Sequence, residues 1–219
     1  MYKLLIFDWD GTIIDSAARI ISSMQQAARD LKQPELTDAA VRDIIGLGLP
    51  EAIRVLIPGV DEAMIPSMRE RYGHYYLKAD TTPVELFAGV EKTLLNLKES
   101  GYRLAVATGK SRHGLQQVFN ETGLEYLFEL SRCADETTSK PDPHMLHEIL
   151  QEAQVEAKDA VMIGDTEFDL EMGVRAGMDT IAVSYGAHHI DRLKSYNPVL
   201  EMHAFPELES WLKERALNQ

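Results

Sequence analysis

Hydrophobic positions along this chain alternate between short apolar runs and helical patterns. Five runs are candidate strands, of which the one at Phe128 is the weakest: Leu4–Phe7, Leu104–Ala107, Phe128–Leu130, Val161–Ile163 and Thr180–Val183. Their shortness and their Gly, Asp or Thr borders are typical of buried strands. Apolar residues recur at helical spacing between the later runs, at Val90, Leu94 and Leu97, at Leu115, Val118 and Phe119, at Leu146, Ile149 and Leu150, and at Leu170 and Val174. This alternation predicts an α/β fold, a Rossmann-like parallel sheet flanked by helices, with ligands at the carboxyl ends of its strands.

Residues 15–83 interrupt this rhythm, because they hold helical patterns and no convincing strand. One apolar helix face consists of Ile20, Met24, Ala27 and Leu31. Thr37 is placed to cap a further helix that we expect Gly46 to terminate. The segment is far longer than an ordinary loop. We therefore predict an inserted all-helical cap domain at 15–83 and a discontinuous core at 1–14 and 84–219.

Composition and charge narrow the function classes. The 219 residues carry a net charge of −13, which argues against nucleic acid as a partner, because phosphate backbones need clustered Lys and Arg. A single cysteine, Cys133, excludes an intrachain disulfide. No apolar run is long enough to span a bilayer, and the N-terminal run is too short for a secretory signal. We expect a cytoplasmic protein without a membrane partner, as a monomer or homodimer.

Carboxylates follow two of the predicted strands. Asp8 and Asp10 leave the first strand one residue apart, beside Gly11. Such a pair is self-repelling unless a proton or cation relieves it, and oxygen ligands favour magnesium. The alternative is an Asp-Gly turn. The fourth strand ends at Asp165, with Asp169 four residues later. If the two strands are neighbours, Asp165 reaches the same cation as Asp8, and the alternative is that Asp165 caps the following helix.

Two further segments supply groups that bind anions. Thr108 and Gly109 end the second strand ahead of a helix, where a hydroxyl and an open N–H can hold an anion. A Ser/Thr-capped helix start is the alternative. Lys140 lies in the segment Lys140-Pro141-Asp142-Pro143 ahead of another helix. It is either a solvated surface lysine or the fixed positive charge that a carboxylate cluster needs to accept a phosphate.

These four segments, in this order, resemble the haloacid dehalogenase superfamily of phosphohydrolases. The motifs that carry the resemblance are Asp8–Thr12, Thr108–Lys110, Lys140–Pro143 and Gly164–Asp169. The match covers nearly the whole chain and points to the phosphoglycolate phosphatase-like branch with a helical cap. The resemblance implies hydrolysis of a small-molecule phosphomonoester, phosphoglycolate-like or a sugar phosphate.

The resemblance also implies roles for these residues. Asp8 would be the nucleophile and form an aspartyl-phosphate. Asp10 would first protonate the leaving alkoxide and then deprotonate the attacking water. Mg²⁺ would be held by an Asp8 carboxylate oxygen, the Asp10 backbone carbonyl and Asp165, and Asp169 would order its water or Lys140.

Phosphate binding and substrate choice involve other residues. Thr108 and the Gly109 N–H would bind phosphoryl oxygens, and Lys140 would neutralise them and steady Asp8. Because the global charge opposes anions, attraction of the substrate must be local, with Lys110 and Arg112 as further candidates.

The cap is expected to choose the substrate. Arg42 and the bend at Gly46 are its candidate contacts, and Arg42 as a solvent-facing residue is the alternative. Tyr72, Tyr75 and Tyr76 are interpreted as the buried stripe of a cap helix, and His188 and His189 as a surface or loop pair.

Two other functions stay open. A phosphomutase of the β-phosphoglucomutase type resembles this pattern, but such relatives usually carry a His where Ile20 stands and an Arg near Leu49. A phosphoaspartate signalling module also combines carboxylates, a hydroxyl and a lysine around magnesium. That class places its acceptor Asp after the third strand and has no long cap, whereas Asp8 follows the first strand here.

Overall fold

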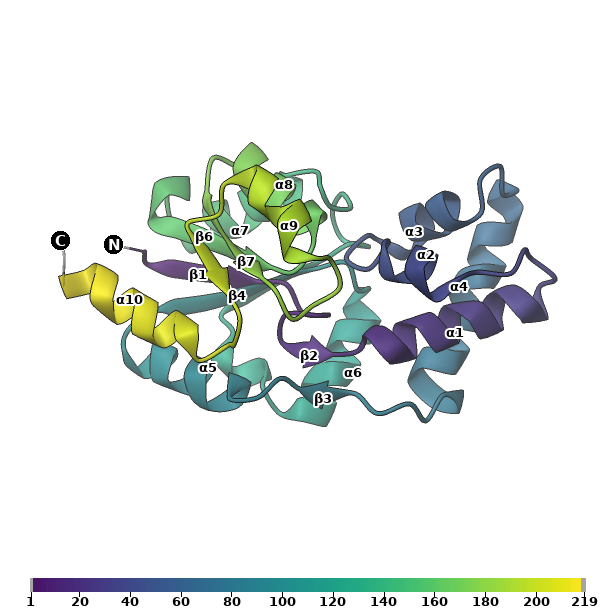
Figure 1. Ribbon diagram of the computed structural model, residues 1–219, viewed down its shortest axis with the longest axis horizontal. Coiled ribbons are helices and arrows are strands. Elements are labelled where there is room, and N and C mark those ends of the chain that lie inside the picture. Colours follow the sequence, from purple (N-terminus) through teal and green to yellow (C-terminus); the bar gives the residue numbers. More distant parts are fainter. Residues whose placement is uncertain (1, 218–219) are drawn as a thin grey trace.

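The core is a parallel β-sheet with helices on both faces (Figure 1). The computed structural model describes residues 2–217, and within this range the sheet has six strands in the order β5-β4-β1-β6-β7-β8. The strands are β1 (Leu4–Phe7), β4 (Arg103–Thr108), β5 (Leu130–Cys133), β6 (Ala160–Gly164), β7 (Asp179–Val183) and β8 (Leu200–Met202). Every neighbouring pair is parallel. The predicted fold class, with its all-helical cap, is confirmed.

Alternation of side chains along the buried strands places the helices. Leu5 and Phe7 of β1 belong to one apolar cluster, and Leu4 and Ile6 to another, because successive strand residues face opposite sides of a sheet. The first face is covered by α5 (Val90–Glu99), α6 (Arg112–Thr122) and α10 (Glu207–Leu217). The second is covered by α7 (His144–Ala153) and α8 (Glu167–Arg175), and α9 (Ile190–Leu193) packs beside α8. Single 3-10 turns occur at Glu62–Met64, Glu125–Leu127, Ala157–Asp159 and Lys194–Tyr196.

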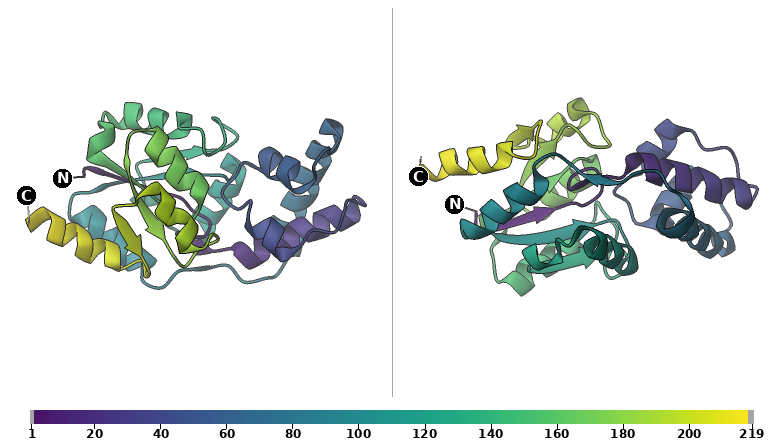
Figure 2. Two further views of the ribbon diagram at one scale, coloured as in Figure 1. Left: turned by 45° about the horizontal axis from the view of Figure 1, so that its top comes forward. Right: turned by 90° about the horizontal axis from the view of Figure 1, so that it is seen from below.

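The cap stands at one end of the core and away from both described chain ends (Figure 2). The chain enters it through β2 (Ile14–Asp15) and leaves it through β3 (Glu85–Leu86), and these two strands pair antiparallel. Our proposed boundaries, after residue 14 and before residue 84, stay predictions; the first divides β2, and the second lies one residue before β3. The cap contains α1 (Ala17–Asp30), α2 (Asp38–Arg42), α3 (Leu49–Leu56), α4 (Ile65–His74) and a π-helical turn (Tyr75–Ala79). Its helices enclose their own apolar cluster.

Three details differ from the sequence predictions. Strand β5 begins at Leu130 and not at Phe128, because Phe128 closes the 3-10 turn Glu125–Leu127, where its N–H donates to the Glu125 carbonyl at 3.1 Å. Strand β8 was not predicted, since its three residues form the edge of the sheet and only Met202 is buried. The helix capped by Thr37 ends at Arg42, and turns carry the chain on to Gly46, where φ is +101°.

Candidate active site

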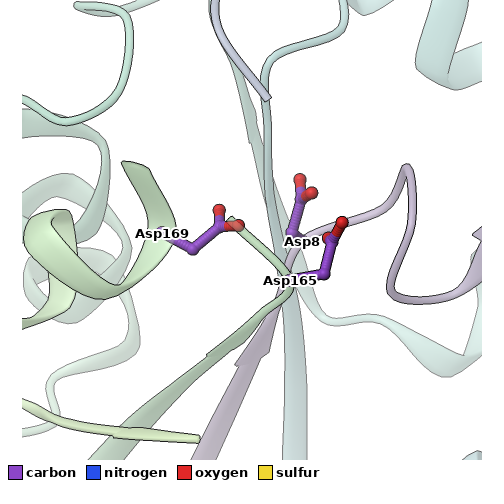
Figure 3. Close-up of side chains that lie close together, drawn as sticks. All are labelled: Asp8, Asp165 and Asp169. Carbon is purple, nitrogen blue, oxygen red and sulfur yellow. The ribbon is translucent and has the colours of Figure 1, made fainter. Parts of the chain in front are cut away.

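The sheet order brings the predicted motifs to one edge. Strand β1 lies between β4 and β6, so Asp8, Thr108 and Asp165 leave three adjacent strands at their carboxyl ends. Figure 3 shows the carboxylates of Asp8, Asp165 and Asp169 directed toward a common space. One oxygen from each lies within 4.8 Å of the others, and all three side chains are buried.

Lys140 supplies the positive charge within this group. Its Nζ lies 2.6 Å from Asp8 Oδ1 and 2.7 Å from Asp169 Oδ1, and its side chain is fully buried. The alternative of a solvated surface lysine is therefore contradicted. Burial alone would lower the pKa of the ammonium, but the Asp169 and Asp8 carboxylates outweigh it and raise that pKa. Lys140 is positively charged throughout the physiological range.

Asp165 is held in place by two hydrogen bonds. Its Oδ1 accepts from the Thr12 hydroxyl at 2.8 Å, and its Oδ2 accepts from the Ala187 N–H at 2.7 Å. It does not cap α8, because Thr166 does so in a capping box with Asp169. A Cβ at Gly11, where φ is +81°, would approach the Asp165 carboxylate closer than 3.0 Å, so this turn requires glycine for two reasons.

The residues present fit a divalent cation. Three buried carboxylates and one ammonium leave a formal charge of −2, which one such ion neutralises. Asp8 Oδ2 is buried and accepts no hydrogen bond from any residue in the range 2–217. Burial raises the pKa of Asp8 well above its ordinary value despite the opposing effect of Lys140. Burial and the Asp169 charge raise the pKa of Asp165 to about 7. A cation bound to these oxygens would favour the charged forms of both acids.

The Asp10 side chain lies outside this acidic group, in a different environment. Its Oδ1 accepts from the Ser16 hydroxyl at 2.5 Å and pairs with Lys110 Nζ at 3.0 Å. Lys110 in turn donates to the Tyr76 hydroxyl of the cap at 3.0 Å and lies 4.5 Å from the centre of that ring. Burial would lower the pKa of Lys110, but Asp10 and the tyrosine outweigh it and raise the pKa. Lys110 is therefore the positive charge that is paired with Asp10.

Thr108 and Gly109 end β4 beside the cap. Thr108 is buried, and its hydroxyl accepts from the Lys110 N–H at 3.2 Å. It does not cap α6, because Ser111 does. A Cβ on Gly109 would come closer than 3.0 Å to the carbonyl oxygens of Gly46 and Leu47. The bend at Gly46 thus rests directly on the candidate phosphate-binding turn.

A cavity of about 730 Å³ lies between the cap and the core. Asp10, Gly109 and Gly46 line it. Arg42, the predicted cap contact, is exposed to solvent and does not line the cavity within residues 2–217. A different arginine of the cap, Arg69, does line it. Arg112 is engaged by Glu136 at 2.7 Å.

Tyrosines of the cap also line the cavity. The rings of Tyr72 and Tyr76 are stacked, with centroids 5.6 Å apart, and both line it. Tyr75 instead donates to Asp30. Helical periodicity marked these tyrosines as an apolar stripe, but no signal in the sequence distinguished a cavity wall from a buried core.

A second set of contacts joins the cap to the core. His188 lies in the loop between β7 and α9, one of the two predicted settings, but it is buried because its ring contacts both the cap and the core. Its Nδ1 accepts from the Glu167 N–H, so Nε2 carries the proton and donates to the Asp43 carbonyl at 3.1 Å. Arg192 pairs with both Asp43 of the cap and Glu167 of the core. His189 is exposed, as expected.

This chain is similar to known proteins over nearly its whole length. The model of the haloacid dehalogenase-like hydrolase family matches residues 5–183. The probable phosphatase IndB of Dickeya dadantii is 34% identical over 212 residues, which are 95% of this chain and 92% of the relative. A phosphoglycolate phosphatase of Colwellia psychrerythraea is 28% identical over 96% of this chain and 97% of its own. A solved structure of a predicted phosphoglycolate phosphatase from Haemophilus somnus, 23% identical, has a TM-score of 0.87 and covers 96% of this chain and 98% of that one.

The chain therefore belongs to the haloacid dehalogenase-like hydrolase family. The resemblance inferred from the four motifs is confirmed at this level. Among residues 2–217, none of the helices combines the length and the apolar character that a membrane span requires.

Proposed function

We propose that this protein is a Mg²⁺-dependent phosphatase that hydrolyses a small-molecule phosphomonoester through an aspartyl-phosphate on Asp8. The names of its relatives support phosphatase activity. One observation carries the mechanism: Asp8 Oδ2 is buried and unpartnered within the described residues, while Oδ1 is fixed by Lys140 at 2.6 Å. One oxygen of the carboxylate is thus oriented and the other is available to react.

The two half-reactions need one nucleophile and one proton carrier. A carboxylate oxygen of Asp8 forms a bond to phosphorus while the bond from phosphorus to the alkoxide oxygen breaks, and a protonated Asp10 gives its proton to that alkoxide. Water then attacks the same phosphorus, the bond to Asp8 breaks, and Asp10 takes the proton from the water. Asp10 suits this role because it lines the cavity and lies apart from the acidic group around Asp8.

The other residues stabilise the phosphoryl group. Lys140, Thr108 and the Gly109 N–H would bind its oxygens as negative charge develops on them. Mg²⁺ would be held by an Asp8 oxygen, the Asp10 backbone carbonyl and Asp165, and it would screen the repulsion between the anionic nucleophile and the anionic ester. Asp169 would keep Lys140 in place, at 2.7 Å.

Phosphatase activity is favoured over the two alternatives by features of the cap. Two apolar side chains of the cavity lining are Ile20 and Leu49. Mutase-like relatives usually carry a His at the first position and an Arg near the second. A mutase needs polar groups there to hold a second phosphate. A signalling module needs a long-lived acyl phosphate and has no use for a substrate cavity between its acceptor and a cap.

The test is phosphate release from p-nitrophenyl phosphate with MgCl₂, with and without EDTA. We expect steady turnover that EDTA stops and that fresh Mg²⁺ restores. Strong stimulation by a sugar bisphosphate with little net release of phosphate would instead identify a mutase. A stable phosphoprotein without turnover would identify a signalling module. No release from a broad phosphoester panel with fresh Mg²⁺ would contradict the proposal.

A further inference from the structure

The cavity is far larger than a two-carbon leaving group requires. Its volume of about 730 Å³ falls in the range of pockets that enclose ligands of several rings. Asp10, the expected proton donor to the leaving oxygen, lines it together with Gly109, whereas the phosphoryl-binding residues Asp8 and Lys140 are buried outside its lining. The alcohol part of the ester therefore begins at Asp10 and extends into this cavity.

The inner wall of the cavity is mostly hydrocarbon. Its apolar and aromatic residues from the cap include Ile20, Met24, Leu47, Leu49, Tyr72 and Tyr76. The Tyr76 hydroxyl is already engaged by Lys110 at 3.0 Å. A substrate hydroxyl buried against the hydrocarbon of this wall loses its hydrogen bonds to water, which opposes binding.

Charged residues also line the cavity. Asp10 and Lys110 do so with nearly buried side chains that pair with each other at 3.0 Å, and others do so at exposed positions. Arg69, Glu70 and His113 line it, and all three are exposed to solvent. They can contact a polar substituent at the outer end of a ligand. At the end of the cavity nearer the phosphate, the charges of Asp10 and Lys110 already neutralise each other.

We infer that the ester carries a bulky and largely apolar alcohol, at least the size of a benzyl group, and not glycolate or a polyol sugar. This inference rests on the proposed function and adds the substrate class to it. The energetic reason is burial of apolar surface against the six wall residues, a contribution that a two-carbon acid or a sugar cannot make.

The experiment compares kcat/KM for four monoesters: benzyl phosphate, ethyl phosphate, 2-phosphoglycolate and glucose 6-phosphate. All are alkyl phosphates, so differences report mainly on the fit of the alcohol. We expect benzyl phosphate to exceed each of the other three by about tenfold or more, the discrimination that a fitted apolar pocket provides.

A matched pair of variants on α3 locates the effect. Leu49→Asn places an amide on the cavity wall, while Val55→Asn makes the same kind of change at an exposed position of the same helix outside the lining. Leu49→Asn should lower the benzyl-to-ethyl ratio of kcat/KM about fivefold. Val55→Asn should leave that ratio at its original value.

The outcomes separate the two claims. If phosphate is released but 2-phosphoglycolate or glucose 6-phosphate equals or exceeds benzyl phosphate, the inferred substrate class is wrong and the phosphatase proposal stands. If both Asn variants lower the ratio equally, the cavity wall is not the cause and the inference is wrong. If none of the four esters releases phosphate while p-nitrophenyl phosphate is hydrolysed, the inference is wrong and the phosphatase proposal stands; if p-nitrophenyl phosphate and the broad panel also release none, both fail.

Discussion

At the scale of single residues, the site is organised by two lysines with different tasks. Lys140 balances part of the charge of Asp8 and Asp169 from a fully buried position. Lys110 does the same for Asp10, and it is attached to the cap through the Tyr76 hydroxyl. Because a buried carboxylate without a partner is costly, each lysine keeps its aspartate in a defined place.

The pairing of Lys110 with Asp10 leads to the first prediction. Replacing Lys110 with Met removes the counter-charge and the link to Tyr76 but keeps an unbranched side chain of similar length. We expect kcat/KM for p-nitrophenyl phosphate to fall between about tenfold and a hundredfold, because the general acid is no longer held in position. Kinetics should be reported with the melting temperature, so that loss of fold is distinguished from loss of function.

Lys92→Met is the matched control, since Lys92 is exposed on α5 and should show unchanged kinetics. If Lys110→Met is as active as the unmodified protein, Lys110 only packs between the domains and takes no part in positioning Asp10.

At the scale of elements, cap and core meet through a few specific contacts. The Gly48 N–H of the cap donates to the Ser139 hydroxyl at 2.8 Å, one residue before Lys140. Arg192 bridges Asp43 of the cap and Glu167 of the core. These contacts hold the loop at 43–48 against the core. The local stability of this loop therefore reports on how firmly the cap is closed over the core.

Removal of this bridge is the second prediction. Arg192→Met should accelerate hydrogen exchange at Ile45–Gly48 and raise KM severalfold, because the cap loop separates more readily from the core. Arg54→Met is the matched control. Arg54 pairs with Glu51 and Glu62 within the cap alone and has similar exposure. Equal exchange rates at the loop in both variants would show that the Arg192 bridge does not hold the cap.

Sequence patterns predicted the elements of the core better than those of the cap. Strands β1, β4, β6 and β7 were predictable because each is an apolar run buried on both faces. The edge strand β8 and the two-residue strands β2 and β3 carry no such run, since each buries few residues. Acidic residues at strand ends indicated the site because parallel strands end at one edge.

The wall of the cavity was not predictable from periodicity. Ile20 and Met24 form an apolar helix face, and this face both packs in the cap's own cluster and lines the cavity. The spacing of apolar residues is the same for a helix face in a buried core and for one that lines a cavity. The two can be distinguished only from the way in which the cap and the core pack against each other. The pairing of Lys110 with Asp10 and Tyr76 was hidden for the same reason, because it joins residues from three separate segments.

At the scale of the whole molecule, cation binding is coupled to pH and stability. The pKa of Asp165 is raised to about 7 in the folded, metal-free protein, against about 4 for an unfolded chain. Between these values the folded state binds more protons, so this group's contribution to stability is fully present below about pH 4 and is lost as pH rises toward about 7.

The third prediction follows from this coupling. Mg²⁺ displaces the proton and stabilises the charged form, so the increase in melting temperature on replacing EDTA with Mg²⁺ should be larger at pH 8 than at pH 5.5. Differential scanning calorimetry at both pH values measures it. Asp165→Asn should remove most of the Mg²⁺ effect. An equal shift at both pH values would mean that no buried acid titrates with the cation.

Asp8 is the proposed nucleophile, and mass spectrometry of the phosphorylated enzyme tests this role most directly. The protein is mixed with Mg²⁺ and benzyl phosphate, quenched rapidly in acid and digested, and the peptide that contains Asp8 is analysed. We predict an added phosphoryl group on Asp8 during turnover, and neither this group nor phosphate release in Asp8→Asn. Phosphate release at the normal rate by Asp8→Asn, or a phosphoryl group on another residue, would contradict the account.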